Sequence, residues 1–143
     1  MRRTLALALV ASLTAAAAIA AEMSVKDDMK QVVEPSANTI FAVGGDVDPA
    51  NGPDAAKVPA ERWAEALAAA QKLTAVGARL TGPQKQPGEE WTKAAGDFAK
   101  LAADAEAAAT KKDGAAFSKA ANDLGDTCTA CHAKFKTQTA DVS

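Results

Sequence analysis

The segment Cys128-Thr129-Ala130-Cys131-His132 holds both cysteines and the only histidine of this 143-residue chain. Two cysteines separated by two residues and followed directly by histidine are typical of covalent haem attachment. Residues three and four apart share one face of a helix, so two thiols can reach the vinyl groups at one porphyrin edge while the imidazole reaches the iron. The spacing predicts one haem c, bound through Cys128 and Cys131, with His132 as the proximal iron ligand.

Three other uses of these residues are less compatible with the sequence. A structural zinc site needs four well-spread nitrogen or sulfur ligands, and the chain has only three Cys and His residues in total. A redox-active dithiol is expected beside a βαβ pattern, and no strand pattern is found. A disulfide across three residues would close a very short loop and contribute little stability. Haem attachment is therefore favoured.

The N-terminal segment has the pattern of a secretory signal peptide. Arg2 and Arg3 precede a run from Thr4 to Ile19 that contains only Ala, Leu, Val, Ile, Ser and Thr, and Ala18-Ile19-Ala20 supplies a small-residue cleavage signal. As a membrane anchor this run is short and poor in large apolar residues. We expect residues 1–20 to be removed by cleavage near Ala20/Ala21, and the protein to be exported to the periplasm, where bacteria attach haem covalently. Residues 21–143 then have the size of a single domain.

Composition excludes several classes of function. The formal net charge is −2 and becomes more negative once Arg2 and Arg3 are removed, so nothing indicates nucleic-acid binding. Residues after the N-terminal run include no stretch apolar enough to span a membrane. The sequence contains no second histidine and no evident pair of nucleophile and base, so we do not expect an enzyme. Abundant alanine and lysine, few aromatic residues and no tyrosine favour helices.

The first helix is expected to begin at Ser24, where Ser24-Val25-Lys26-Asp27 resembles a capping box with Asp in place of Glu. Pro35 should kink or divide this helix, and Gly44-Gly45 should end it. Its apolar residues recur at helical spacing: Val25, Met29, Val32, Val33, Ile40 and Phe41.

A loop is predicted from Asp46 to Val58, because this segment is dense in Pro, Gly, Asp and Asn. Asp46 and Asp48 raise the question of a calcium site. The EF-hand pattern fails, since Ala50 stands where the third oxygen ligand belongs and Gly52 is one position late. A solvated acidic loop is expected instead.

Three further helices follow. The second begins at Pro59 and ends at Thr81-Gly82-Pro83, the third begins at Glu89 and Glu90, and the fourth begins near Asp113. Each has an apolar stripe. The stripe of the second helix is Trp63, Leu67, Ala70, Leu73, Gly77 and Leu80, and that of the third is Trp91, Ala94, Ala95, Phe98, Leu101, Ala102 and Ala105. The stripe of the fourth helix is Phe117, Ala120, Ala121, Leu124, Cys128, Cys131 and Phe135. We predict an all-α fold, an antiparallel four-helix bundle with haem attached to the C-terminal helix.

The C-terminal motif resembles that of a known family. Cys128-Thr129-Ala130-Cys131-His132-Ala133-Lys134-Phe135-Lys136 is similar to the C-x-x-C-H-x-x-[FY]-[KR] ending of class II cytochromes c, the cytochrome c′ and cytochrome c556 group. The order of elements, with four helices and haem attachment on the last, also agrees. The resemblance implies a haem between the helices, with His132 on one side and residues of the first helix on the other.

The resemblance makes Met29 the residue that separates two functions. In c556-like members a methionine of the first helix binds the sixth position of the iron, which suits a carrier of single electrons. In cytochrome c′ an apolar, non-ligating side chain leaves that position open to small gases such as nitric oxide. Met29 lies close to where the family places this residue, although Pro35 departs from the straight helix of the family. Ordinary core packing is the other role open to Met29.

The resemblance also concerns Lys136 and the partners. Lys136 takes the basic position after the aromatic residue, where it would contact a haem propionate. The alternative for Lys136 is a solvated charge that the helix dipole favours at a C-terminus. A redox partner protein is implied, but no motif specifies it. Members of the family often form homodimers through their first two helices.

Overall fold

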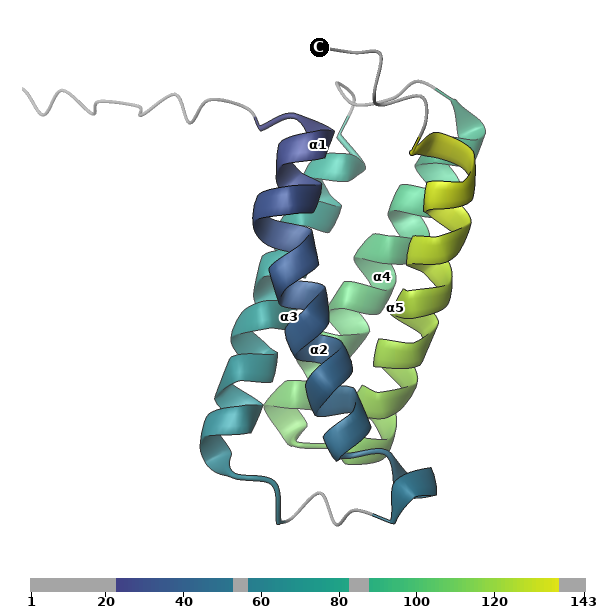
Figure 1. Ribbon diagram of the computed structural model, residues 1–143. Coiled ribbons are helices and arrows are strands. Elements are labelled where there is room, and N and C mark those ends of the chain that lie inside the picture. The colour runs from purple at the N-terminus through teal and green to yellow at the C-terminus, as the bar shows by residue number, and fades with distance from the viewer. Residues whose placement is uncertain (1–22, 53–56, 83–87, 137–143) are drawn as a thin grey trace, which may run out of the picture.

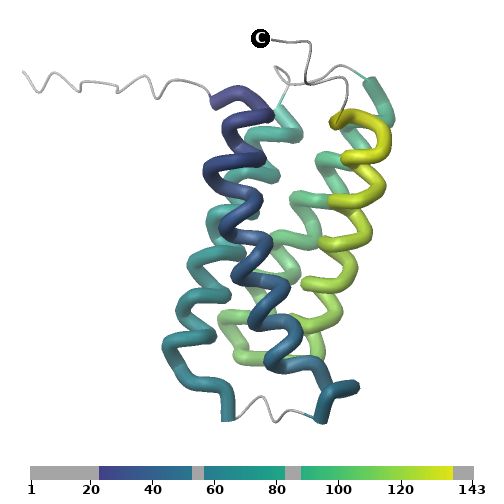
Figure 2. The backbone as a smooth tube through the Cα atoms, viewed as in Figure 1, coloured from purple at the N-terminus to yellow at the C-terminus, as the bar shows by residue number. Residues whose placement is uncertain are grey.

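The computed structural model describes residues 23–52, 57–82 and 88–136, and within these ranges its regular structure is entirely helical. The predicted signal peptide, its cleavage site at Ala20/Ala21 and the polar tail after Lys136 lie outside them. The long helical segments stand side by side (Figures 1 and 2). They are a composite first rod, of α1 (Val25–Asp27), η1 (Asp28–Val33) and α2 (Glu34–Asp46), followed by α3 (Ala60–Leu80), α4 (Glu89–Lys111) and α5 (Gly114–Phe135). A short 3-10 turn, η2 (Pro49–Asn51), follows α2.

The first rod begins as predicted. The hydroxyl of Ser24 accepts a hydrogen bond from the Asp27 N–H at 3.1 Å and donates one to the Asp27 carboxylate at 2.6 Å. The interruption expected at Pro35 takes the form of a π turn over residues 28–33, just before the proline. The Glu34 N–H donates to the Met29 carbonyl, five residues back, where an α-helix would reach four back. The rod stays continuous through this change (Figure 1).

Two expectations for the first rod are wrong. The helix does not stop at Gly44-Gly45 but runs to Asp46, since glycine within a helix is tolerated where a neighbour approaches closely. A Cβ at Gly44 would lie 2.6 Å from the Ala121 Cβ of α5. Phe41 was counted among the apolar residues at helical spacing, but it does not share their buried face and is 40% exposed. It directly follows the fully buried Ile40 and is therefore rotated about 100° away from it around the helix.

The aspartates after α2 have structural partners. Asp46 accepts two hydrogen bonds from the guanidinium of Arg62 in α3, the shorter at 2.7 Å. The carboxylate of Asp48 accepts from the Ala50 N–H at 2.9 Å and so caps η2. These contacts explain both residues without a calcium ion.

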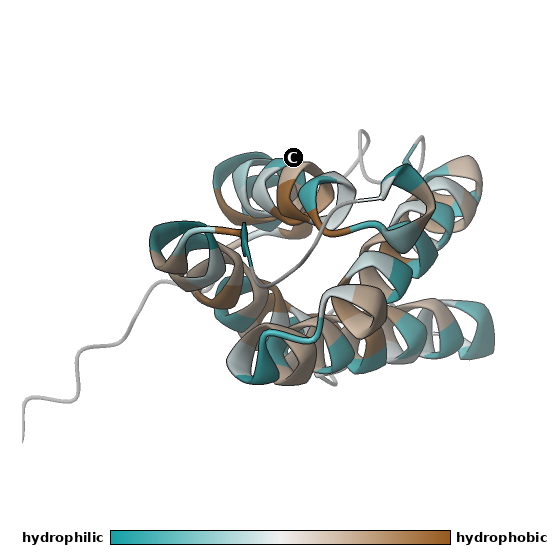
Figure 3. Ribbon diagram, turned by 90° about the horizontal axis from the view of Figure 1, so that it is seen from below, coloured by the Kyte–Doolittle hydropathy of each residue, from teal (hydrophilic) through white to brown (hydrophobic). Residues whose placement is uncertain are grey.

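The predicted starts of the other helices agree with the structure to within a residue. Pro59 is the N-cap of α3, α4 begins at Glu89, and Asp113 caps α5 by accepting from the Ala116 N–H at 3.0 Å. Gly77 allows the close approach that its size predicts, because a Cβ there would lie 2.8 Å from the Ala99 Cα of α4. Viewed along the bundle, hydrophobic residues face inward and hydrophilic residues face outward (Figure 3).

No helix among the described residues is long and apolar enough to cross a membrane.

Candidate functional site

A pocket opens at the end of the bundle where η1, the end of α3, the start of α4 and the end of α5 meet. We call it the inner pocket, and it contains about 460 Å³ of space not filled by atoms, part of it open to solvent. Its enclosed cavity volume is only about 50 Å³, below the about 300–1,000 Å³ of typical ligand pockets, so a haem-sized ligand would also occupy the adjoining open space. Its lining comprises Met29 and Val33 of η1, Leu80 of α3, Trp91, Ala94, Ala95 and Phe98 of α4, and Thr127, Cys128, Cys131 and His132 of α5.

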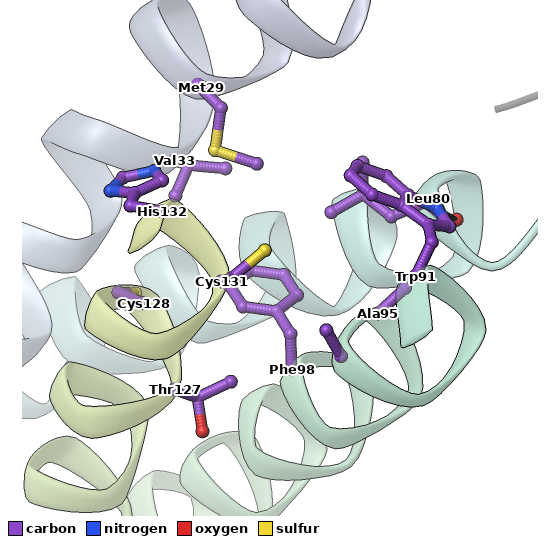
Figure 4. A pocket seen from close by; sticks show the side chains of 11 residues that line it. Met29, Val33, Leu80, Trp91, Ala95, Phe98, Thr127, Cys128, Cys131 and His132 are labelled. Atoms are coloured by element: carbon purple, nitrogen blue, oxygen red, sulfur yellow. Dashed lines mark hydrogen bonds between the residues drawn. The ribbon is translucent and has the colours of Figure 1, made fainter. Parts of the chain in front are cut away.

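Four of the five residues expected at the cofactor therefore line one pocket: Met29, Cys128, Cys131 and His132. Met29 is about one hundred residues distant from the others in sequence, and the first rod brings it to them. The Cys131 sulfur and the Met29 thioether both point into the space between η1, α4 and α5 (Figure 4). Apart from Thr127, Cys and His, the walls are apolar side chains, which suit a flat hydrophobic ligand.

The two thiols are free and half-buried. Burial raises the pKa of both, and the neighbouring Cys131 raises the pKa of Cys128 further. Catalytic dithiols require a lowered pKa, because the thiolate is the reactive form. These surroundings therefore do not favour the dithiol alternative.

His132 occupies the exposed side of the pocket. Its ring is turned away from the Cys131 sulfur in Figure 4, and the residue as a whole is exposed. Among the described residues no three His, Cys, Asp or Glu side chains are grouped as direct ligands of one ion. Helical spacing places His132 one turn beyond Cys128, so both project from the same face of α5.

The inner pocket continues into a wider groove toward solvent, which we call the outer groove. The two share Met29, Val33, Trp91, Cys131 and His132. The outer groove has a cavity volume of about 540 Å³ and is partly open to solvent. Its remaining lining is Val25, Lys26, Lys30, Glu34, Phe135 and Lys136, so three lysines stand at its margin. Lys136, expected near a haem propionate, is one of them.

The structure reveals an ion pair next to Met29 that the sequence analysis missed. Asp28, whose side chain is fully buried, accepts hydrogen bonds from Nη2 and Nε of Arg79 in α3. These hydrogen bonds raise the pKa of Arg79 above its ordinary value. A signal was present in the sequence: Asp28 follows Val25 by three residues and therefore lies on the apolar stripe, where a charged group needs a partner.

Two aromatic residues of the wall were also assigned no role from the sequence. Trp91 and Phe98 of α4 line the inner pocket, whereas Trp63 packs in the core at the other end of the bundle. The Trp91 Nε1–H donates to the Leu80 carbonyl at 3.0 Å, and its ring meets Phe135 edge-on with centroids 5.2 Å apart. Trp91 thus joins α3, α4 and α5 at the pocket.

Comparisons of the chain with protein-family models, with curated proteins and with solved structures give no significant match.

Proposed function

We propose that this protein is a periplasmic monohaem c-type cytochrome that carries single electrons. One observation supports the proposal above all others: Met29, Cys128, Cys131 and His132 line the same apolar pocket although they come from opposite ends of the chain. The cysteine–histidine motif alone would identify an attachment site. The addition of a thioether from a separate helix gives that site two candidate axial ligands.

Each residue has a distinct role in the proposal. Cys128 and Cys131 would hold the haem through thioether bonds, and the His132 imidazole and the Met29 thioether would supply ligands to its iron. The bound haem supplies one-electron chemistry at its iron, and the protein supplies ligands, a pocket of low polarity and a docking surface. A thioether ligand raises the reduction potential of haem iron, which suits an electron carrier.

The surroundings fit an amphipathic ring. The inner pocket has apolar walls, while Lys26, Lys30 and Lys136 stand at the margin of the outer groove. A porphyrin with its hydrophobic edge inward would turn its two propionates toward these ammonium groups, and opposite charges would favour that orientation. The proposal extends to the whole bundle, as an antiparallel arrangement with the haem on its last helix, and to export through the N-terminal segment.

The first test is the mass of the matured protein. We expect expression with the c-type maturation machinery to add the mass of one haem. Cys128→Ala and Cys131→Ala should each lose a thioether bond. A wild-type chain without added haem mass would refute the proposal. Covalent haem mass that persists when Cys128 and Cys131 are both replaced by alanine would refute the assigned attachment.

The second test concerns the sixth position of the iron. Met29→Ala should abolish the methionine–iron charge-transfer band and lower the reduction potential, since the thioether stabilises the reduced iron. Met23→Ala is the matched control, because Met23 is the same residue type six positions earlier and lines neither cavity. Spectra that do not change in Met29→Ala would exclude ligation by this residue.

Unchanged spectra in Met29→Ala would favour a second function, the binding of small gases. Val33 and Leu80 line the inner pocket beside Met29, so a Met29 sulfur held off the iron would leave an apolar space for a small gas. A wild-type spectrum that is high-spin and shifts strongly with carbon monoxide would identify a gas-binding protein with an open iron.

A further inference from the structure

Asp28 is the only charged residue that the described ranges bury completely. It begins the π turn η1 and directly precedes Met29. A buried carboxylate is costly unless it is paired and hydrogen-bonded, and Arg79, whose side chain is 36% exposed, is the partner that Asp28 requires. The position of this pair directly beside a candidate ligand raises the question of what the pair does for Met29.

The geometry of the pair restricts orientation. Nη2 of Arg79 donates to Oδ1 of Asp28, and Nε donates to Oδ2 at 3.3 Å. Two donors of one rigid guanidinium on two oxygens of one carboxylate fix direction as well as distance. The remaining Nη1 donates to the Ala75 carbonyl of the same helix at 3.4 Å, which anchors the guanidinium on α3.

The pair is connected to the wall of the inner pocket. Arg79 precedes Leu80, and the Leu80 carbonyl accepts the hydrogen bond from Trp91. Met29, Leu80 and Trp91 all line the pocket, so each partner of the ion pair is the sequence neighbour of a lining residue. Polar bonds thus join η1, α3 and α4 at this end of the bundle.

The π turn lies between two constraints. Pro35 has no N–H and cannot donate to the Gln31 carbonyl, so a regular α-helical bond is missing at the C-terminal side of the turn. Asp28 fastens the N-terminal side to α3. A π turn contains one more residue than an α-helical turn, so it rotates the helix on its N-terminal side by about 100°. The direction of this rotation decides whether the Met29 side chain faces the pocket or the solvent. Such π turns occur frequently at functional sites.

We propose that the Asp28–Arg79 pair is a positioning device that holds η1 against α3 so that the Met29 sulfur stays at the sixth position of the iron. The inference rests on the proposed haem site and names the residues that control its axial ligand. Neither Asp28 nor Arg79 touches the iron in this scheme. Loss of the pair frees η1 and lets Met29 leave.

The experiment compares haem-loaded Asp28→Asn and Arg79→Gln with wild type and with Arg62→Gln. Arg62 is a matched control, since it forms an exposed two-carboxylate pair with Asp46 and Glu65 far from the pocket. We expect both pair variants to lose the methionine–iron band and to bind carbon monoxide about 5- to 150-fold more tightly, the usual span of coupling between two sites. Arg62→Gln should keep the wild-type band and affinity.

Arg79→Lys separates charge from geometry. Lysine keeps the positive charge but lacks the planar fork, so we expect an intermediate loss of the band. Arg79→Lys also keeps the proposal testable if Asp28→Asn or Arg79→Gln fails to fold. Pair variants that fold and keep the wild-type band and carbon monoxide affinity would overturn the positioning role, because a merely structural pair changes stability without changing ligation.

Hydrogen exchange distinguishes this inference from the proposed function. Amides of residues 28–34 should exchange faster in Asp28→Asn than in Arg62→Gln, whether or not haem is attached. A wild-type chain without haem refutes the proposed function. Unchanged amide exchange in Asp28→Asn refutes the inference that the ion pair holds η1 against α3.

Discussion

The two ends of the bundle contain the same aromatic arrangement in different surroundings. Trp63 and Phe117 meet edge-on with ring centroids 5.7 Å apart, and Trp91 and Phe135 do so at 5.2 Å. Trp63 and Phe117 are 3% and 0% exposed, and they fill the core. Trp91 and Phe135 form part of a cavity wall, and Phe135 is only half-buried.

We call these the closed end and the open end. The closed end contains Val43 of the first rod, Val47 directly after the rod, Ala66 of α3 and Phe117 of α5, all fully or almost fully buried. At the open end the stripe of α5 continues through Cys128 and Cys131, but these residues are only half-buried because a pocket replaces the opposing side chains. The comparison suggests that the closed end stabilises the fold while the open end keeps room for a ligand.

The largest difference should come from truncating the two phenylalanines. Phe117→Ala removes a fully buried ring and should lower the free energy of unfolding by about 3–5 kcal/mol. Phe135→Ala should lower it by about 1 kcal/mol, because its ring already borders open space. Denaturant unfolding of the two variants without haem measures both values. Equal losses would contradict the division into a closed and an open end.

Enlarging one alanine at each end tests the same division in the opposite direction. Ala66 is fully buried at the closed end, so Ala66→Leu should cost about 1–3 kcal/mol through overpacking. Ala95 lines the inner pocket, and the extra methyl groups of Ala95→Leu can enter the empty space. We expect the haem-free Ala95→Leu variant to unfold at or above the wild-type denaturant concentration.

The same Ala95→Leu variant should attach less haem in maturation, because the leucine occupies the space of the ring. Ala66→Leu serves as the control for general damage to folding. Full haem loading of Ala95→Leu would show that the ligand does not enter the inner pocket.

Sequence reasoning found the helices because their signals are local. Ser24, Asp113 and the apolar stripes lie within a few residues of what they determine, and the structure confirms the starts of all four helical segments to within a residue. The backbone conformation inside the first rod was harder to predict from the sequence. Pro35 predicted an interruption, but neither the π turn nor the bond from Arg79 of α3 to Asp28 at its start could be read from local spacing.

The wall of the site could not be assigned from local patterns. Trp63 and Trp91 both lie on buried stripes, and spacing alone cannot tell which of them faces a partner side chain and which faces a cavity. The difference between the two tryptophans depends on where along the bundle the four helical segments move apart. Asp28 was the exception, since a carboxylate on an apolar stripe could have been recognised as a residue in need of a cation.

The smallest expected effect concerns the helix caps at the two ends. Asp113 caps α5 at the closed end, and Asp113→Ala should lower the global free energy of unfolding by about 1 kcal/mol, with exposed Asp126→Ala as the control. Ser24 makes the corresponding bond at the start of α1, at the open end. Because α1 contains no buried residue, we expect it to open while the rest of the bundle stays folded, so Ser24→Ala should change global unfolding less than Asp113→Ala does. Faster amide exchange confined to residues near α1 would then show that the open end unfolds as a separate unit, whereas equal global losses in the two variants would mean that both ends unfold together.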